Sequence, residues 1–182
     1  MSRIPVVVPS AAGEARPLLE AIGKSLGITP NLYRVVAHSP AALAGVLELT
    51  KALAKGRLGG RVREQLALAV AQANHCDYCL SAHTAIGRSM KVPDAELELA
   101  RQGRASDPRA EAALRFALRV LESRGGVDDA DVTDARRAGL DDGQLVEIVA
   151  EVALNVFTNY LNKVAKTEID FPVVRADETR AA

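Results

Sequence analysis

The sequence lacks the features that would tie it to a nucleic acid or a membrane. Its 23 Lys and Arg residues balance 23 Asp and Glu residues, and the longest basic clusters are pairs such as Arg136 and Arg137. Such a chain has no net charge that would attract a polyanion or an anionic membrane surface. No run approaches the roughly 20 apolar residues that are needed to span a bilayer. We therefore expect neither nucleic acid nor membrane among its partners.

Cysteine is scarce too, because the chain has only Cys76 and Cys79. The first 17 residues hold a short apolar run that Pro5 and Pro9 interrupt, so they lack the apolar segment of roughly 7–15 residues that a secretory signal peptide requires. A cytoplasmic location is the default expectation. Because thiols stay reduced there, a close cysteine pair is expected to be catalytic or metal-binding rather than a structural crosslink.

Tryptophan is absent and aromatic residues make up 3% of the chain, whereas apolar residues make up 48%. The core must therefore be aliphatic. Apolar residues recur at helical spacing, as in Leu18, Ile22 and Leu26, and strand alternation is nearly absent. The sequence predicts an all-α bundle of eight or nine helices in one domain, residues 1–182, with an extended tail over residues 171–182.

Both cysteines lie in the segment NHCDYCLSAHTAIGR. Cys76, Cys79 and His83 have the offsets i, i+3 and i+7, which share one face of an α-helix. Asn74 is a good capping residue, so we expect a helix to begin near His75 or Cys76. The unpaired N–H groups and the dipole of that helix start favour a thiolate, and a neighbouring imidazole lowers a thiol pKa further. This is the arrangement that a reactive dithiol needs.

Glu64 is the fourth residue of interest, and it precedes Cys76 by 12 positions. In one unbroken helix this separation would place the two residues about 18 Å apart along the axis. A bend near Asn74 and His75 would fold two helices together and bring the carboxylate towards His83. Any mechanism that uses Glu64 within one subunit requires this bend.

The spacing of Glu64, Cys76, Cys79 and His83 resembles the active-site signature of the AhpD-like alkylhydroperoxidases, in the carboxymuconolactone decarboxylase superfamily. The segment REQLALAVAQANHCDYCLSAHTAIGR is similar to the family core, which covers about residues 40–100. The later segment AGLDDGQLVEIVAEVALNVFTNYLNKVAKTEIDFP resembles the C-terminal helix of the peroxidase-related subset. The resemblance implies an AhpD-like helical bundle that forms homo-oligomers, commonly trimers or hexamers built from them.

The resemblance also implies a role for each residue of the signature. Cys79 would attack the O–O bond of a hydroperoxide substrate and become a sulfenic acid, which Cys76 would resolve as a disulfide. His83 would accept the Cys79 proton, and Glu64 would orient His83 and relay protons. An external dithiol would reduce the disulfide again by exchange. Neither a cofactor nor a metal ion is expected.

Other interpretations of these residues stay open. The cysteines could be small buried hydrophobes, or they and His83 could bind zinc with His75 or Glu64 as the fourth ligand. Structural zinc sites usually draw their ligands from two separated pairs, and no second pair is present. Glu64 could be an ordinary surface residue, and His83 could be a core histidine. Asp77, between the cysteines where some family members carry a histidine, would tend to raise nearby thiol pKa values.

Further polar residues have no assigned role at this stage. Tyr78 could line the pocket or serve packing alone, and His75 is expected at a helix start. Asn155, Asn159 and Asn162 share one helix face. We favour a polar contact between helices for this face, or at most a subunit interface, over a substrate site.

Three functions are compatible with the sequence. The leading hypothesis is a thiol-dependent peroxidase that reduces hydroperoxides, and the aliphatic surroundings favour organic ones. The second is a lyase of the carboxymuconolactone decarboxylase type, which would not need the cysteine pair. The third is a redox-sensing helical oligomer without enzymatic activity, whose disulfide would change its assembly.

Overall fold

Nine α-helices, without a strand, make up the regular structure of the residues that this computed structural model describes, 2–177, apart from two short 3-10 turns at Pro9–Ala11 and Gly13–Ala15. The all-α prediction of eight or nine helices is therefore confirmed. The helices are α1 (Arg16–Leu26), α2 (Asn31–Val36), α3 (Pro40–Leu53), α4 (Gly60–Ala73), α5 (Asp77–Ser89), α6 (Asp94–Arg101), α7 (Pro108–Ser123), α8 (Asp129–Arg137) and α9 (Asp142–Ala165).

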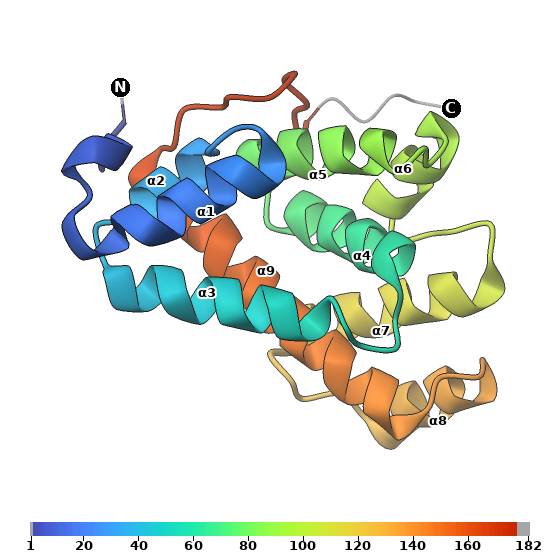
Figure 1. Ribbon diagram of the computed structural model, residues 1–182. Helices are drawn as coiled ribbons and strands as arrows, with labels where there is room; N and C mark the ends of the chain where they lie inside the picture. Colours follow the sequence, from blue (N-terminus) through green and yellow to red (C-terminus); the bar gives the residue numbers. More distant parts are fainter. Residues whose placement is uncertain (1, 178–182) are drawn as a thin grey trace.

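The middle of the molecule is occupied by α4, which packs against α5, α6, α7 and α9 (Figure 1). Every residue of α4 from Gln65 to Ala71 is buried. A helix that is surrounded by other helices must be apolar on nearly all sides, and the alanines of this stretch allow its neighbours to approach closely. Glu64 and Arg63, just before the buried stretch, are the charged residues that α4 carries into the interior.

The helices α1, α2 and α3 lie at the side of the molecule that holds the N-terminus, where α2 and α3 pack against α9 (Figure 1). Leu19, Ile22 and Leu43 are among the buried residues of their common core. Local signals set the helix ends: Gly27 ends α1 with φ of 75°, a conformation that glycine adopts without strain. The hydroxyl of Ser39 accepts a hydrogen bond from the N–H of Ala42 at 3.2 Å and caps α3.

The longest helix, α9, crosses the molecule diagonally, and the chain then returns over α2 and α5 (Figure 1). We call residues 168–177 the C-terminal strap; they form neither helix nor strand. The expected tail over residues 171–182 falls partly within the strap, and residues 178–182 lie outside the described part of the chain. No helix within residues 2–177 is both long enough and apolar enough to cross a membrane.

Candidate active site

A tight turn between α4 and α5 creates the bend that the position of Glu64 required. The N–H of Cys76 donates to the carbonyl of Ala71 at 2.9 Å, and His75 between them has φ of 50°. This is a Schellman ending, in which one left-handed residue stops the helix and satisfies its last carbonyls. The chain reverses there, so that α5 packs back along α4.

The helix α5 begins at Asp77, next to the expected start near His75 or Cys76, but its capping residue is not the expected one. Asn74 is the last residue of the α4 turn, and its side chain reaches across to α9, where Nδ2 donates to Oδ1 of Asn159 at 3.0 Å. The capping residue of α5 is Cys76, whose sulfur accepts a hydrogen bond from the N–H of Cys79 at 3.4 Å. The expectation that Asn74 caps α5 was therefore wrong, because the Schellman turn already engages the backbone of residues 74–76.

The two cysteines form a disulfide within the first turn of α5. Their side chains are buried, with 2% of Cys76 and 3% of Cys79 exposed. Cys79 is the third residue of the helix and lines a cavity, whereas Cys76 is absent from the cavity wall. The two sulfurs therefore have different surroundings, and Cys79 is the one that a small molecule in the cavity meets.

His83 and Glu64 form the polar pair of the site. Nδ1 of the imidazole lies 2.8 Å from Oε2 of the carboxylate. Because a carboxylate only accepts, Nδ1 carries the proton and Nε2 is the nitrogen left to bind or release one. Burial lowers the pKa of His83, but the charge and hydrogen bond of Glu64, together with the charge of Glu151, outweigh burial, so that the pKa is raised above its ordinary value.

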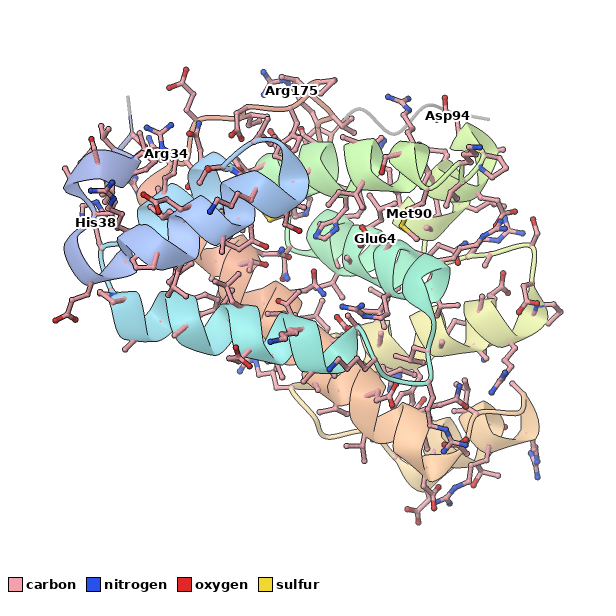
Figure 2. The ribbon with its side chains drawn as sticks, viewed as in Figure 1. Arg34, His38, Glu64, Met90, Asp94 and Arg175 are labelled. Atoms are coloured by element: carbon pink, nitrogen blue, oxygen red, sulfur yellow. A yellow bond between two sulfur atoms is a disulfide. The ribbon has the colours of Figure 1, made fainter. Side chains whose placement is uncertain are left out.

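The cavity has a volume of about 400 Å³ and lies between α2, α3, α4, α5 and α9, with the last residue of α1 and one residue of the strap in its wall. Its lining is mostly apolar, as with Leu32, Ala67, Leu154 and Phe171. Glu64, His83, Arg63 and Glu151 are the charged or basic side chains that line the same cavity as Cys79. In Figure 2, Glu64 lies on α4 near the middle of the molecule, below α5, whereas His38 lies at the left edge, near the N-terminus.

Sequence reasoning did not anticipate the ion pair between Arg63 and Glu151 in the cavity wall. Nε of Arg63 donates to Oε1 of Glu151, and both side chains are largely buried. The two residues are 88 positions apart, so no local pattern relates them. Tyr33 was also missed; burial, followed by the charge of Glu64, raises the pKa of its phenol.

The residues between the cysteines hold the strap. The hydroxyl of Tyr78 donates to Oδ1 of Asp170 at 2.8 Å and accepts from the N–H of Leu32 at 3.0 Å. Burial raises the pKa of this phenol, so it stays a donor. Oδ1 of Asp77 accepts from the N–H of Ala176 at 2.9 Å. Tyr78 thus lines the cavity, which was one of the two alternatives from the sequence, and it also fixes the strap, a role that the sequence did not suggest.

The charge of Asp77 has a cation beside it. Nη1 of Arg175 lies 3.3 Å from its Oδ2, at the strap above α5, where Figure 2 labels the arginine. This pairing reduces the unfavourable field that Asp77 would otherwise exert on the neighbouring thiols.

The asparagine face of α9 contacts the redox pair inside one subunit. Asn155, Asn159 and Asn162 are all buried. Nδ2 of Asn162 lies 3.3 Å from Sγ of Cys79 and donates to it. Asn159 and Asn162 therefore make the polar contact favoured from the sequence, with the turn that carries the cysteines, whereas Asn155 donates to the carbonyl of Glu151 in its own helix and lines the cavity.

The zinc alternative has no arrangement of ligands to support it. Within residues 2–177, no three His, Cys, Asp or Glu side chains are placed to hold a metal ion. His75 is exposed, and its Nδ1 lies 3.8 Å from a carboxylate oxygen of Asp177, which is exposed as well. The four residues of the signature are brought together around one turn, and their catalytic roles stay predictions.

Comparisons with known proteins agree with the all-helical fold. The model of the carboxymuconolactone decarboxylase family matches residues 40–123. A crystal structure from Ralstonia eutropha JMP134, described as an alkylhydroperoxidase AhpD core and an uncharacterized peroxidase-related protein, is 27% identical, with a TM-score of 0.84 over 93% of this chain and 92% of that one.

Two further structures share the fold at lower identity. An uncharacterized peroxidase-related protein from Silicibacter sp. TM1040 is 22% identical, with a TM-score of 0.78 over 90% of this chain and 91% of that one. A cysteine-to-alanine variant of the debrominase Bmp8 in complex with 2,3,4-tribromopyrrole is 20% identical, with a TM-score of 0.77 over 92% of this chain and 91% of that one. A comparison with curated proteins finds no match. The family match over residues 40–123 and the fold shared over nearly the whole chain support an AhpD-like member of the carboxymuconolactone decarboxylase superfamily.

Proposed function

We propose that this protein is a thiol-dependent peroxidase that reduces organic hydroperoxides. The observation that carries the proposal is the position of Cys79, which is paired with Cys76 and lines the same cavity as the His83–Glu64 pair. A thiolate alone is not sufficient, because the alkoxide is a poor leaving group until a proton reaches it. A nucleophile beside an oriented proton carrier supplies both needs.

The first half of the reaction consumes the hydroperoxide. Nε2 of His83 takes the proton of Cys79, and the thiolate attacks the terminal oxygen of ROOH. The O–O bond breaks, Cys79 becomes a sulfenic acid, and the leaving alkoxide takes the proton from His83 to form ROH. Glu64 keeps Nδ1 protonated, and its charge stabilises the imidazolium that forms between the two proton transfers.

The second half restores the thiols. Cys76 attacks the sulfenic sulfur, forms the disulfide and releases water, so that one hydroperoxide consumes the two electrons of two thiols. An external dithiol then reduces the disulfide by exchange. We propose the cytoplasm as the location, because regeneration requires a reducing compartment.

The cavity supports organic substrates over hydrogen peroxide. Its volume of about 400 Å³ exceeds what a molecule of two oxygen atoms needs, and its walls are largely apolar. Binding of an alkyl or aryl group there would bury apolar surface, which contributes roughly 25 cal/mol for each Å².

A stoichiometric assay tests the proposal. One equivalent of cumene hydroperoxide should remove two free thiols from the reduced protein and yield one equivalent of cumyl alcohol. Cys79→Ser should do neither. Survival of both thiols in excess hydroperoxide would sink the proposal. Retention of a lyase activity in Cys76→Ala would instead favour the decarboxylase alternative, which needs no cysteine pair.

Reductive debromination is the second candidate, because the same dithiol supplies the same two electrons. The aromatic rings of Tyr33, Tyr78 and Phe171 contribute to the cavity wall, and the fold is shared with the debrominase Bmp8. The Cys79 thiolate would take the bromine as a sulfenyl bromide, and the aryl carbon would take a proton. Cys76 would then displace bromide and close the disulfide. Release of one bromide ion from 2,3,4-tribromopyrrole per two thiols consumed tests this candidate; no bromide release would reject it.

We also propose that copies of the chain associate through α9, as trimers or hexamers. Its solvent face carries an apolar stripe with the helical spacing of a packing surface. The exposed fractions of its members are 69% for Val146, 47% for Val149, 40% for Phe157, 54% for Tyr160 and 58% for Val164. A stripe of this kind is typical of an interaction surface.

A further inference from the structure

One buried amide of α9 points at the sulfur that faces the cavity. Asn162 is 4% exposed, and its Nδ2 donates to Sγ of Cys79 at 3.3 Å. We propose that this amide stabilises the thiolate of Cys79 in the reduced protein and thereby favours Cys79 over Cys76 as the nucleophile. The inference deepens the proposed function, because it concerns the sulfur that the peroxidase reaction would use.

The hydrogen bonding of Asn162 is poorly explained by stability alone. Its Oδ1 is buried and has no partner among the described residues, so the bond to sulfur is the one hydrogen bond in which the side chain takes part. A buried amide with an unsatisfied oxygen costs free energy that an apolar side chain of similar size avoids. A sulfur in a disulfide is a weak acceptor, whereas a thiolate is ionised and accepts strongly. The bond therefore gains most of its strength when the disulfide is reduced.

Neighbouring contacts hold the amide in place. Asn159, three positions earlier on α9, accepts a hydrogen bond from the side chain of Asn74 at 3.0 Å. Nζ of Lys163 donates to the carbonyl of Asn74 at 2.8 Å. Both bonds join α9 to the turn between α4 and α5, so the register of the helix against the cysteines is fixed on either side of Asn162.

The two sulfurs differ in the donors that reach them. Sγ of Cys76 accepts from the backbone N–H of Cys79 at 3.4 Å, and both residues lie at the same helix N-terminus. The dipole of α5 therefore favours both thiolates. The amide of Asn162 contacts Cys79 alone. The other ionisable side chains around the cavity are Tyr33 on α2, Arg63 and Glu64 on α4, Tyr78 and His83 on α5, and Glu151 on α9.

The pKa of Cys79 tests the proposal directly. In a Cys76→Ser background Cys79 is the only thiol, and its rate of alkylation by iodoacetamide can be followed against pH. Adding Asn162→Leu should raise the thiol pKa by about one unit, because a hydrogen bond to an ionised group is lost. Alkylation at a pH below both pKa values should then slow by about ten-fold. The surrounding ionisable groups are the same in both proteins, so the difference reports the amide.

Two further variants make the result decisive. Asn162→Ala removes the donor without adding an apolar branch, and it should also raise the pKa of Cys79. This variant replaces Asn162→Leu in the experiment if Asn162→Leu does not fold. Asn155→Ala is the matched control, since Nδ2 of Asn155 donates to the carbonyl of Glu151 in its own helix and does not bind sulfur. A Cys79 pKa that stays within about 0.2 units in both Asn162 variants, or that shifts equally in the control, overturns the proposal.

The readout separates this inference from the proposed function. Alkylation needs no hydroperoxide, so a raised Cys79 pKa supports the role of Asn162 whatever the wild-type protein does with peroxide. If the wild-type thiols survive hydroperoxide while the variants shift, the peroxidase proposal fails and the thiolate contact stands. If hydroperoxide oxidises the wild-type thiols while the pKa of Cys79 is unchanged in the Asn162 variants, the proposed role of Asn162 fails and the peroxidase proposal stands.

Discussion

Glu64 and His83 are 19 positions apart in the chain and come from different helices, yet the carboxylate and the imidazole are in hydrogen-bond contact at 2.8 Å. The turn that reverses the chain at His75 makes this contact possible. The same turn starts α5 with the cysteine pair. One backbone feature therefore assembles the sulfurs, the imidazole and the carboxylate.

Glu64→Gln should lower the pKa of His83. The carboxylate charge raises that pKa against the opposing effect of burial, and glutamine removes this charge although its amide oxygen can still accept a hydrogen bond from Nδ1. An NMR titration of the imidazole in the oxidised protein, where no thiol titrates, measures the change. Glu48→Gln, on the exposed side of α3, should leave the titration of His83 where it is. An unchanged midpoint in Glu64→Gln would contradict the attribution to this carboxylate.

The same shift predicts how stability depends on pH. A histidine whose pKa is raised on folding contributes stability below its ordinary pKa, near 6.5, and this contribution is lost as the pH rises through the folded value. Glu64→Gln should therefore reduce the free energy of unfolding by about 1–2 kcal/mol at about pH 5.5 and by less at about pH 9. Urea unfolding of the oxidised protein at both pH values measures the difference; a larger loss at the higher pH would reverse the sign.

Cys76→Ser should trap the oxidised form of Cys79. Without the resolving thiol, the sulfenic acid persists and reacts with dimedone, adding one label per chain by mass. Multiple turnover should stop after a single equivalent of hydroperoxide. Wild-type protein should form its disulfide and stay unlabelled, and Cys79→Ser should be unlabelled as well. A dimedone label on Cys76 in the Cys79→Ser variant would mean that Cys76 attacks the hydroperoxide and that Cys79 is the resolving thiol.

Asp170→Asn should loosen the C-terminal strap. The two carboxylate oxygens accept hydrogen bonds from the N–H of Asn31 and the hydroxyl of Tyr78, each at 2.8 Å, and a neutral amide has only one oxygen to offer. The backbone amides of Val174 and Ala176 report the strap, and their hydrogen exchange should accelerate by about ten-fold, equivalent to roughly 1.4 kcal/mol.

The control for this change is Asp134→Asn, on α8 and in an exposed ion pair with Arg137. It removes a carboxylate without touching the strap, so the exchange of both amides should stay at the wild-type rate. Equal acceleration in the two variants would mean that the strap responds to general destabilisation and that Asp170 does not hold it.

Phe157→Glu should dissociate the oligomer that we propose, because a carboxylate in the middle of the apolar stripe would be desolvated in an interface. Size-exclusion chromatography with light scattering measures the mass. Val8→Glu places the same charge on an exposed apolar residue outside the stripe and should leave the mass unchanged. A wild-type chain that is monomeric at micromolar concentration would remove the basis of the proposal.

Local sequence signals were enough to predict the helices. Gly27, Ser39 and the spacing of apolar residues act on neighbours within a few positions, so their effect can be recognised without knowledge of the fold. The bend between Glu64 and Cys76 was expected only on the condition that Glu64 acts with His83 in one subunit, because an unbroken helix would keep Glu64 and Cys76 about 18 Å apart. The cap of α5 was predicted wrongly, since Asn74 suits a helix start as well as a helix end and only the turn geometry decides between them.

Contacts between distant segments could not be predicted. Asn162 and Cys79 are 83 positions apart, and Tyr78 and Asp170 are 92 apart. The spacing of the polar residues in the strap and in α9 does not identify the distant residues that they contact. Their roles became visible when α9 and the returning chain were placed against the first turn of α5.

The left-handed backbone conformation of His75 restricts which residue types can occupy position 75. Gly, Asn, Asp and His tolerate a positive φ, whereas a β-branched residue or proline does not. Natural relatives that keep this turn are therefore expected to vary among those few residues at position 75. The side chain of His75 lines no part of the cavity, yet the positive φ of its backbone limits which residues can replace it.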